Sequence, residues 1–176
     1  MKNEGLTFTV VFLAESANYG EGVGNITTLK KMTRGNYEQY SYISRQAMRY
    51  NIVQQLKWDN TPVDGKSGVV QFAPSATIKD YPEIDLFGYM KTVAKKETQA
   101  GGASTRSAVV RLSNAVALEP YQSDLEFLTN MGLASRCGQN NAIAQSEIHR
   151  SYYSYTVAID LDRIGIDGEV KIPQEE

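Results

Sequence analysis

Apolar and polar residues alternate in three segments of the chain, and a period of two is typical of a half-buried β-strand. The first segment covers residues 6–15, the second residues 107–118 and the third residues 151–160. We therefore expect three strands that each turn one side toward a core. The predicted inward side chains are Leu6, Phe8, Val10, Phe12 and Ala14 in the first segment, Val110, Leu112, Val116 and Leu118 in the second, and Tyr153, Tyr155, Val157 and Ile159 in the third.

Between the first two strands the pattern becomes helical. Ser41 or Ser44 can cap a helix that runs to about Trp58. At about 100° per residue, Arg45 and Arg49 are about 40° apart on such a helix. Arg45 is also only about 20° from the apolar positions 52 and 56. Both arginines are therefore expected to share a stripe with residues that should be buried.

The segments that connect these elements differ in composition. Residues 59–87 are rich in turn-forming residues and predict an insertion outside the core, and residues 84–96 are compatible with a short helix. Residues 119–148 are first acidic and then rich in Asn, Gln and Gly, which indicates a long excursion. The order of strand, helix, insertion, strand, excursion and strand predicts an α+β domain with an antiparallel sheet.

The net charge of −2 conceals two basic segments. Residues 22–57 contain six lysines and arginines against Glu38, a net charge of +5. Residues 88–118, which include Lys91, Lys95 and Lys96, contain five against one glutamate, a net charge of +4. Segregated positive charge in an otherwise acidic chain favours a local anionic partner, and the alternative is that both segments are solvated faces.

The start of the predicted helix has the chemistry of a phosphate site. A helix N-terminus offers free N–H groups and the positive end of a dipole, and arginines in its first turns add forked donors. The alternative is a pair of salt bridges from the two arginines to acidic residues of the insertion. The candidate donors at and before this helix start are Lys30, Lys31, Arg34, Ser44, Arg45, Gln46 and Arg49.

Aromatic residues are interleaved with the cations of the first basic segment, at Tyr37, Tyr40, Tyr42 and Tyr50. Such a mixture is typical of proteins that bind single-stranded nucleic acid, because cations follow the backbone while rings stack on bases. The alternative is that these rings pack in the core.

Catalytic and metal-binding patterns are poor in this chain. His149 is a candidate general base, but a lone histidine at a strand start is more often structural. Cys137 is the single cysteine, so it has no disulfide partner, and no sequence signal activates it as a nucleophile. Asp160 and Asp162 fit turn chemistry at a strand end, and "GEGVGN" lacks the Lys-Ser/Thr of a phosphate loop. We therefore predict neither a cofactor nor a metal.

No stretch has the features of a signal peptide or the length of a membrane span, so we expect a cytoplasmic protein without a membrane partner.

Several segments resemble one family in the same order along the chain. They are "ANYGEGVGN", "YISRQAMRYNIV", "DLFGYMK", "RSAVVRLSNAVALEPYQSDLEFLTNMGLASR" and "EIHRSYYSYTVAIDLDRIG". Together they resemble the DevR-type backbone subunit of type I (I-B-like) CRISPR surveillance complexes, known as Cascade, over about residues 6–165. The resemblance implies membership of the RAMP superfamily and a modified ferredoxin-like (RRM-like) domain with an antiparallel sheet, a large insertion and a thumb hairpin.

The resemblance also implies a non-catalytic role in antiviral defence. Such subunits line up along CRISPR RNA, contact neighbouring copies and other Cascade subunits, and present the RNA for pairing with target DNA. A thumb displaces a base at regular intervals. Two rival predictions remain open: a RAMP-type endoribonuclease that uses His149 or acidic residues of the thumb region, and a self-assembling protein without nucleic acid.

The family's RNA contacts can be carried over to matching positions. The resemblance implies RNA-binding roles for Asn18, Asn25, Ser44, Arg45, Gln46, Arg49, Arg106 and Ser107, to which the basic segments add Lys30, Lys31, Arg34 and Lys91. The family usually has a proline at the position of Ala108, which precedes Val109. Met131 and Leu133 are the implied wedge residues of the thumb.

The resemblance divides the chain into a palm, a finger-like insertion and a thumb. Residues 1–58, 106–118 and 149–176 are assigned to the palm, residues 59–105 to the insertion and residues 119–148 to the thumb. Family members continue with a further helix and strand, so we expect this chain to be a fragment or to receive the missing half from elsewhere.

Overall fold

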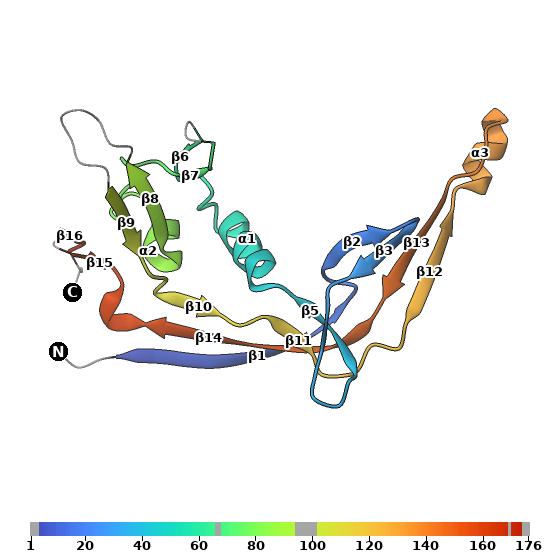
Figure 1. The fold of residues 1–176 in the computed structure, drawn as a ribbon, viewed down its shortest axis with the longest axis horizontal. Helices are drawn as coiled ribbons and strands as arrows, with labels where there is room; N and C mark the ends of the chain where they lie inside the picture. The colour runs from blue at the N-terminus through green and yellow to red at the C-terminus, as the bar shows by residue number, and fades with distance from the viewer. Residues whose placement is uncertain (1–3, 66–67, 94–101, 169, 174–176) are drawn as a thin grey trace. The chain divides into compact units, whose positions relative to one another are not determined.

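A computed structural model describes residues 4–65, 68–93, 102–168 and 170–173 (Figure 1). The fold is a strand-rich mixture of α and β with largely antiparallel sheets, which confirms the predicted α+β class. Lys95, Lys96 and Glu97, which contribute to the second basic segment, lie outside the described residues. No helix in the described ranges is both long and apolar enough to span a membrane.

The elements follow one another along the chain in this order: β1 (Gly5–Glu15), β2 (Tyr19–Val23), β3 (Ile26–Leu29), β4 (Lys31–Thr33), β5 (Gln39–Ile43), α1 (Arg45–Gln55), β6 (Val63–Asp64), β7 (Gln71–Phe72), α2 (Pro82–Phe87), β8 (Tyr89–Val93), β9 (Gly102–Arg106), β10 (Val110–Leu112), β11 (Ala115–Ala117), β12 (Asp124–Thr129), α3 (Met131–Cys137), β13 (Ile143–Ile148), β14 (Arg150–Asp160), a 3-10 turn (Leu161–Arg163), β15 (Ile166–Asp167) and β16 (Val170–Lys171).

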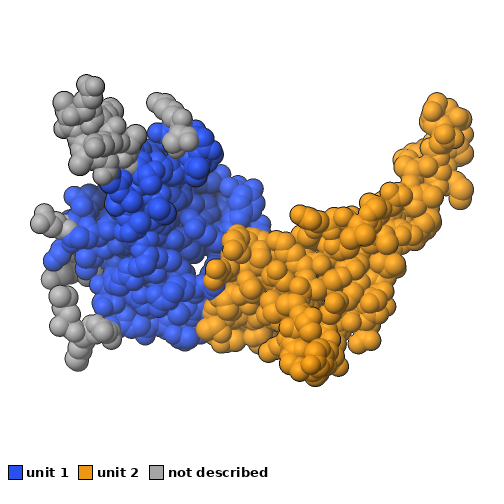
Figure 2. All heavy atoms as spheres, viewed as in Figure 1, with its two compact units in different colours: residues 1–8, 49–112, 157–176 blue, residues 9–48, 113–156 orange. Residues whose placement is uncertain are grey.

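The chain forms two compact units (Figure 2). Unit 1 comprises residues 1–8, 49–112 and 157–176, and unit 2 comprises residues 9–48 and 113–156. The division therefore passes through β1, α1 and β14, which contribute residues to both units.

One sheet has the strand order β1-β14-β11-β5-β4, and β10 also pairs with β14. A second sheet, with the order β12-β13-β3-β2, lies entirely in unit 2. Its β13–β3 pair is parallel, whereas its other two pairs are antiparallel. Unit 1 holds the two-stranded pairs β6-β7, β8-β9 and β15-β16.

The first and third predicted strands are confirmed as β1 and β14. In β1 the expected alternation appears from Val10 onward, while Leu6 and Phe8 are 46% and 43% exposed. In β14 the predicted inward residues Tyr153 and Val157 are buried. Periodicity therefore identified both strands, but it overstated the burial at the start of β1.

The second predicted strand is interrupted between β10 and β11. In β10, Val110 pairs with Ile159, but in β11 Val116 pairs with Ser154, so the register changes by one residue. Such a β-bulge exchanges the two faces of a strand beyond it. The prediction that Val116 and Leu118 face the core was wrong for this reason, and the small residues Ala115 and Ala117 are buried instead.

The predicted basic helix is confirmed as α1, with the later of the two possible starts. The Ala47 N–H donates to the Ser44 hydroxyl over 3.3 Å, which makes Ser44 the N-cap. The helix ends before Lys57, whose positive φ of 56° breaks the α conformation.

The region predicted to lie outside the core has a core of its own within unit 1. Ala76, Ile78 and Ile84 are buried together, and Phe72 and Tyr89 pack against them. The helix compatible with residues 84–96 is limited to α2, because Gly88 has a positive φ of 72° and the chain continues as β8. Residues 94–96 of that prediction lie outside the described part of the chain.

The core of unit 2 consists of Ala115, Ala117 and Tyr153, with Phe12 and Met48 among the half-buried residues around it. From this unit β12 and β13 extend as a two-stranded arm that carries α3 at its end (Figure 1). Every residue of β12 is exposed.

Candidate nucleic-acid interface

The backbone N–H groups at the start of α1 already have partners within unit 2. The Ser44 N–H donates to the Asn18 side-chain oxygen over 3.0 Å, and the Arg45 N–H donates to that of Asn114 over 2.9 Å. The Ala47 N–H donates to the Ser44 hydroxyl, so the N–H groups of Ser44, Arg45 and Ala47, which could have bound a phosphate, already have acceptors. The side chains on this turn are therefore its free donors, and Asn18 orients the helix through its amide oxygen.

Two of the four motif residues on this helix start, Arg45 and Gln46, are exposed. The guanidinium of Arg45 forms no hydrogen bond or ion pair with any residue that the structure describes. The prediction that Arg45 shares the buried stripe was wrong, because Val53 is the buried residue of α1 and Leu56 is 50% exposed. A permanent cation without an internal partner is available to an external anion.

Arg49 behaves differently. Its guanidinium lies 3.4 Å from the carboxylate of Glu83 and stacks over the ring of Phe87, with 35% of its side chain exposed. Glu83 belongs to the predicted insertion, so the salt-bridge alternative is confirmed for Arg49. Because the Arg49 side chain is about one-third exposed, water reaches the pair, and the guanidinium can exchange Glu83 for another anion.

The cations before the helix are also divided between internal and external roles. Lys31 donates to the Glu147 carboxylate over 2.5 Å and lies 4.6 Å from the Tyr121 ring centre. Burial alone would raise the pKa of Glu147, but the hydrogen bonds from Lys31 and the Leu29 N–H outweigh it and lower that pKa. Burial, followed by the Glu147 charge, raises the pKa of Tyr121 to about 12.

Lys30, Arg34 and Asn25 lie in the loops and turns that flank β2 to β5, and none of the three is fully buried. Arg34 is exposed on the turn between β4 and β5, and its guanidinium lies over the Tyr40 ring, 5.3 Å from the ring centre. Lys30 is half-buried and Asn25 is exposed in the turn between β2 and β3. Unit 2 therefore presents the positions 25, 30, 34, 45 and 46 to solvent.

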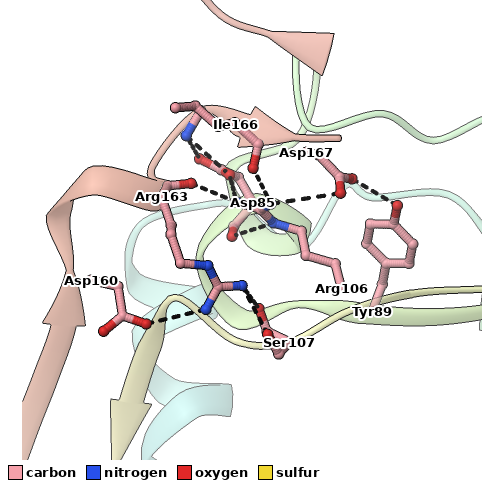
Figure 3. A network of polar contacts seen from close by, with 9 residues as sticks. Asp85, Tyr89, Arg106, Ser107, Asp160, Arg163, Ile166 and Asp167 are labelled. Atoms are coloured by element: carbon pink, nitrogen blue, oxygen red, sulfur yellow. Dashed lines mark hydrogen bonds and ion pairs between the residues drawn. The ribbon is translucent and has the colours of Figure 1, made fainter. Parts of the chain in front are cut away.

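Arg106 is the centre of a buried polar network in unit 1 (Figure 3). Its side chain is 3% exposed and forms an ion pair of 2.5 Å with the equally buried Asp85. It also donates to the backbone carbonyls of Asp85, Arg163 and Ile166, and a carboxylate oxygen of Asp167 lies 3.7 Å away. All of these partners are internal, so the geometry gives Arg106 the task of holding the segment 161–167 against α2.

Lys91 is likewise buried, and its amine donates to the Ala76 carbonyl and lies 4.0 Å from the Tyr89 ring centre. Burial lowers the pKa of Lys91, and the Asp167 charge partly offsets this effect. Ser107 is exposed, and its hydroxyl accepts from the Arg163 guanidinium over 2.8 Å.

His149 is 7% exposed and belongs to a hydrogen-bond chain in unit 2. Its Nδ1 lies 2.7 Å from the Ser41 hydroxyl, which lies 2.6 Å from the hydroxyl of Tyr153. Burial lowers the pKa of His149, although Glu119, Asp124 and a hydrogen bond to the Pro120 backbone oppose this shift. A general base must reach its substrate, and this imidazole is instead enclosed by the core.

The predicted wedge residues lie on α3, at the end of the arm. Met131 and Leu133 are 65% and 64% exposed, and Leu125 and Phe127 along β12 are more than half exposed. No group of three or more His, Cys, Asp or Glu side chains within the described ranges could hold a metal ion.

Sequence reasoning missed two residues that shape this surface. Asn114 lies at the bulge and accepts from the Arg45 N–H, and its turn-forming character within an otherwise apolar segment was the available signal. Glu147 pairs with Lys31 across 116 positions of the chain, and no local pattern could have indicated that contact.

Comparison with known proteins gives two matches. The sequence profile of a family described as "CRISPR-associated negative auto-regulator DevR/Csa2" matches residues 6–175. A protein of Myxococcus xanthus (strain DK1622), described as "CRISPR-associated protein Cas7/Cst2/DevR", is 30% identical over 158 residues. This match covers 81% of the present chain and 52% of the relative, so the chain spans about half the length of that curated protein.

Proposed function

The chain belongs to the DevR/Csa2 family of CRISPR-associated proteins, and from this premise we propose that it is a non-catalytic RNA-binding backbone subunit. In this proposal, copies of the chain line up along CRISPR RNA with other Cascade subunits and hold the RNA for pairing with target DNA. The proposal includes a modified ferredoxin-like palm. The bulged strand β10–β11 and the helix α1, which begins directly after β5, are compatible with such a palm.

The observation that carries the proposal is the exposed guanidinium of Arg45, which has no hydrogen-bond or ion-pair partner in the described part of the chain. It extends from a helix start that Asn18, Asn114 and Ser44 fix in place. Positioned forked donors match phosphate oxygens and carry no base preference. Gln46, Lys30, Arg34 and Asn25 supply further exposed or half-buried polar groups on the same unit.

Arg49 joins this set if RNA competes with Glu83 for its guanidinium. Arg106, Lys91 and Lys31 have buried or paired internal partners, so the proposal gives them the role of shaping the surface. Ser107 remains a proposed RNA contact because the residue is exposed and its hydroxyl, which accepts from Arg163, still has a proton to donate.

The arm formed by β12, α3 and β13 is the proposed thumb. It carries exposed apolar side chains, Met131 and Leu133 among them, that find no partner within the described part of the chain. Contact of such an arm with the next copy would be heterologous, and a heterologous contact generates an open, head-to-tail assembly. This assembly matches a subunit that repeats along an RNA.

An endoribonuclease is the rival function, and the enclosure of His149 weighs against it. The test incubates the protein with labelled single-stranded RNA and follows both protection and cleavage. We expect bound, intact RNA, and a purified protein that carries nucleic acid absorbance. Cleavage by the wild type that is lost in His149→Asn, whose side-chain oxygen can still accept from Ser41, would establish the rival.

A further inference from the structure

Tyr37 has an unfavourable backbone conformation. It lies in the turn between β4 and β5, where its N–H donates to the Arg34 carbonyl over 2.9 Å and the Arg34 N–H donates to the Glu38 carbonyl over 3.1 Å. This geometry places residue 37 in the left-handed region, at φ 65°. Glycine and asparagine tolerate that region, whereas a bulky aromatic residue there is an outlier.

The turn already contains tolerant residues, because Gly35 and Asn36 immediately precede Tyr37. The structure nevertheless has the aromatic residue at the strained position. Backbone strain of this kind persists where another requirement fixes the residue, and it clusters at functional sites.

The ring of Tyr37 finds no compensating contact among the residues that the structure describes. It is 91% exposed, the highest value among the large apolar side chains of the described residues, so packing does not stabilise it. Its side chain forms no ring contact or hydrogen bond with any residue that the structure describes, and the ring contact on this turn is that of Arg34 with Tyr40. An external contact is the remaining reason for its position.

The surroundings of Tyr37 fit a nucleobase better than a protein partner. A protein interface needs a contiguous apolar centre, but the neighbours of this ring in the turn are Arg34, Gly35, Asn36 and Glu38. The Glu38 carboxylate accepts hydrogen bonds from Asn36 and Tyr40 and keeps its negative charge, and the exposed Arg34 is the cation of the turn. An exposed ring three residues from an exposed arginine in one turn offers stacking to a base and a donor to a phosphate.

We infer that Tyr37 and Arg34 form a base-stacking site for one unpaired nucleotide of single-stranded nucleic acid. This inference rests on the proposed function, since it requires RNA on unit 2. It goes beyond that proposal by placing a base, as well as the backbone, in contact with the protein. The turn joins the antiparallel strands β4 and β5, and the ring that it carries is 91% exposed.

The test uses Tyr37→Asn and Tyr37→Gly, which remove the ring and suit the left-handed conformation, and Tyr37→Phe, which keeps the ring. Affinity is measured with single-stranded RNA and with an oligonucleotide of equal length and charge that lacks bases. Thermal unfolding is followed in parallel. We expect the Tyr37→Asn and Tyr37→Gly variants to bind RNA about 5- to 100-fold more weakly than the wild type and to bind the abasic strand equally well. Their melting temperatures should be no lower than that of the wild type. Phe should behave as the wild type.

Wild-type RNA affinity in Tyr37→Asn would overturn the inference and leave the proposed function intact, provided that Arg45→Ala still weakens binding. Equal losses for RNA and the abasic strand would also overturn it, as would a loss of contact between copies with RNA binding unchanged. A wild-type protein that binds no RNA would refute the proposed function and the inference together.

Discussion

Arg106→Ala should lower the stability of unit 1 and have little direct effect on RNA affinity. The substitution removes an arginine whose side chain is 3% exposed and whose ion-pair partner, Asp85, is 7% exposed. After the change the one donor that the Asp85 carboxylate keeps among the described residues is the Gly165 N–H, at 3.0 and 3.2 Å from its two oxygens. An uncompensated buried charge costs about 3–5 kcal/mol, because neither water nor a partner solvates it.

The loss should appear in thermal unfolding. For a chain of this size about 3–5 kcal/mol corresponds to a fall in melting temperature of roughly 6–20 °C. Arg106→Lys should recover only part of the stability, since lysine keeps the charge and loses the fork that reaches three backbone carbonyls. Arg111→Ala is the matched control, because its bidentate pair with Asp160 is half exposed and should contribute less than about 1 kcal/mol.

This prediction separates two roles for Arg106. If the network in Figure 3 is correct, stability falls and the RNA affinity of the protein that remains folded changes little. The opposite result would be an Arg106→Ala variant whose free energy of unfolding is within about 1 kcal/mol of the wild-type value and whose RNA affinity falls more than about tenfold. That result would refute the structural role and show that Arg106 faces the RNA.

Four further predictions follow from other parts of the structure. Arg45→Ala should weaken RNA binding by about 1–3 kcal/mol and reduce the salt slope by about 0.7, without a loss of stability, whereas the exposed control Lys79→Ala should change neither quantity; an unchanged salt slope would contradict the phosphate contact. Because hydrogen bonds lower the pKa of Glu147, its contribution to stability is present above its unfolded pKa of about 4.3 and is lost as the pH falls through the lower folded value. The difference in melting temperature between the wild type and Glu147→Gln should therefore be largest near neutral pH and vanish in acid, and a difference that grows in acid would be inconsistent with the pair. Gly88→Ala should cost at least about 2 kcal/mol, since Gly88 has φ 72° and ψ 176° and an added Cβ would approach Ala108 N to 2.8 Å, whereas Gly102→Ala, which meets nothing within 4 Å, is the control. Leu133→Asp, at an apolar side chain that is 64% exposed, should abolish association between copies in light scattering while the melting temperature is unchanged; intact assembly would remove the thumb assignment.

Local patterns predicted the elements whose conformation depends mainly on residues close to one another in the sequence. Alternation identified β1 and β14, and the sequence limited the start of α1 to Ser41 or Ser44, of which the structure has Ser44 as the N-cap. The period of two failed at the second strand, because a bulge at Ser113 and Asn114 exchanges the two faces of the strand. An alternation extrapolated across the bulge therefore assigns the later residues to the wrong face. Helical geometry placed Arg45 near the buried stripe, but the actual buried face is centred on Val53.

The partners of the charged residues could not be predicted, because they are distant in the chain. Arg106 meets Asp85 across 21 positions and the Ile166 carbonyl across 60. The first basic segment therefore mixes a cation that faces solvent, Arg45, with one that is paired internally, Lys31. Spacing and charge alone do not distinguish the two classes.

The stoichiometry of complexes with RNA tests the central claim most directly. Single-stranded RNAs of unrelated sequence and increasing length would be saturated with the protein, and the masses of the complexes would be measured. A backbone subunit should add copies in proportion to RNA length, with little regard to sequence and without cleavage. A stoichiometry that is independent of RNA length, or an absence of binding at low salt, would contradict the account.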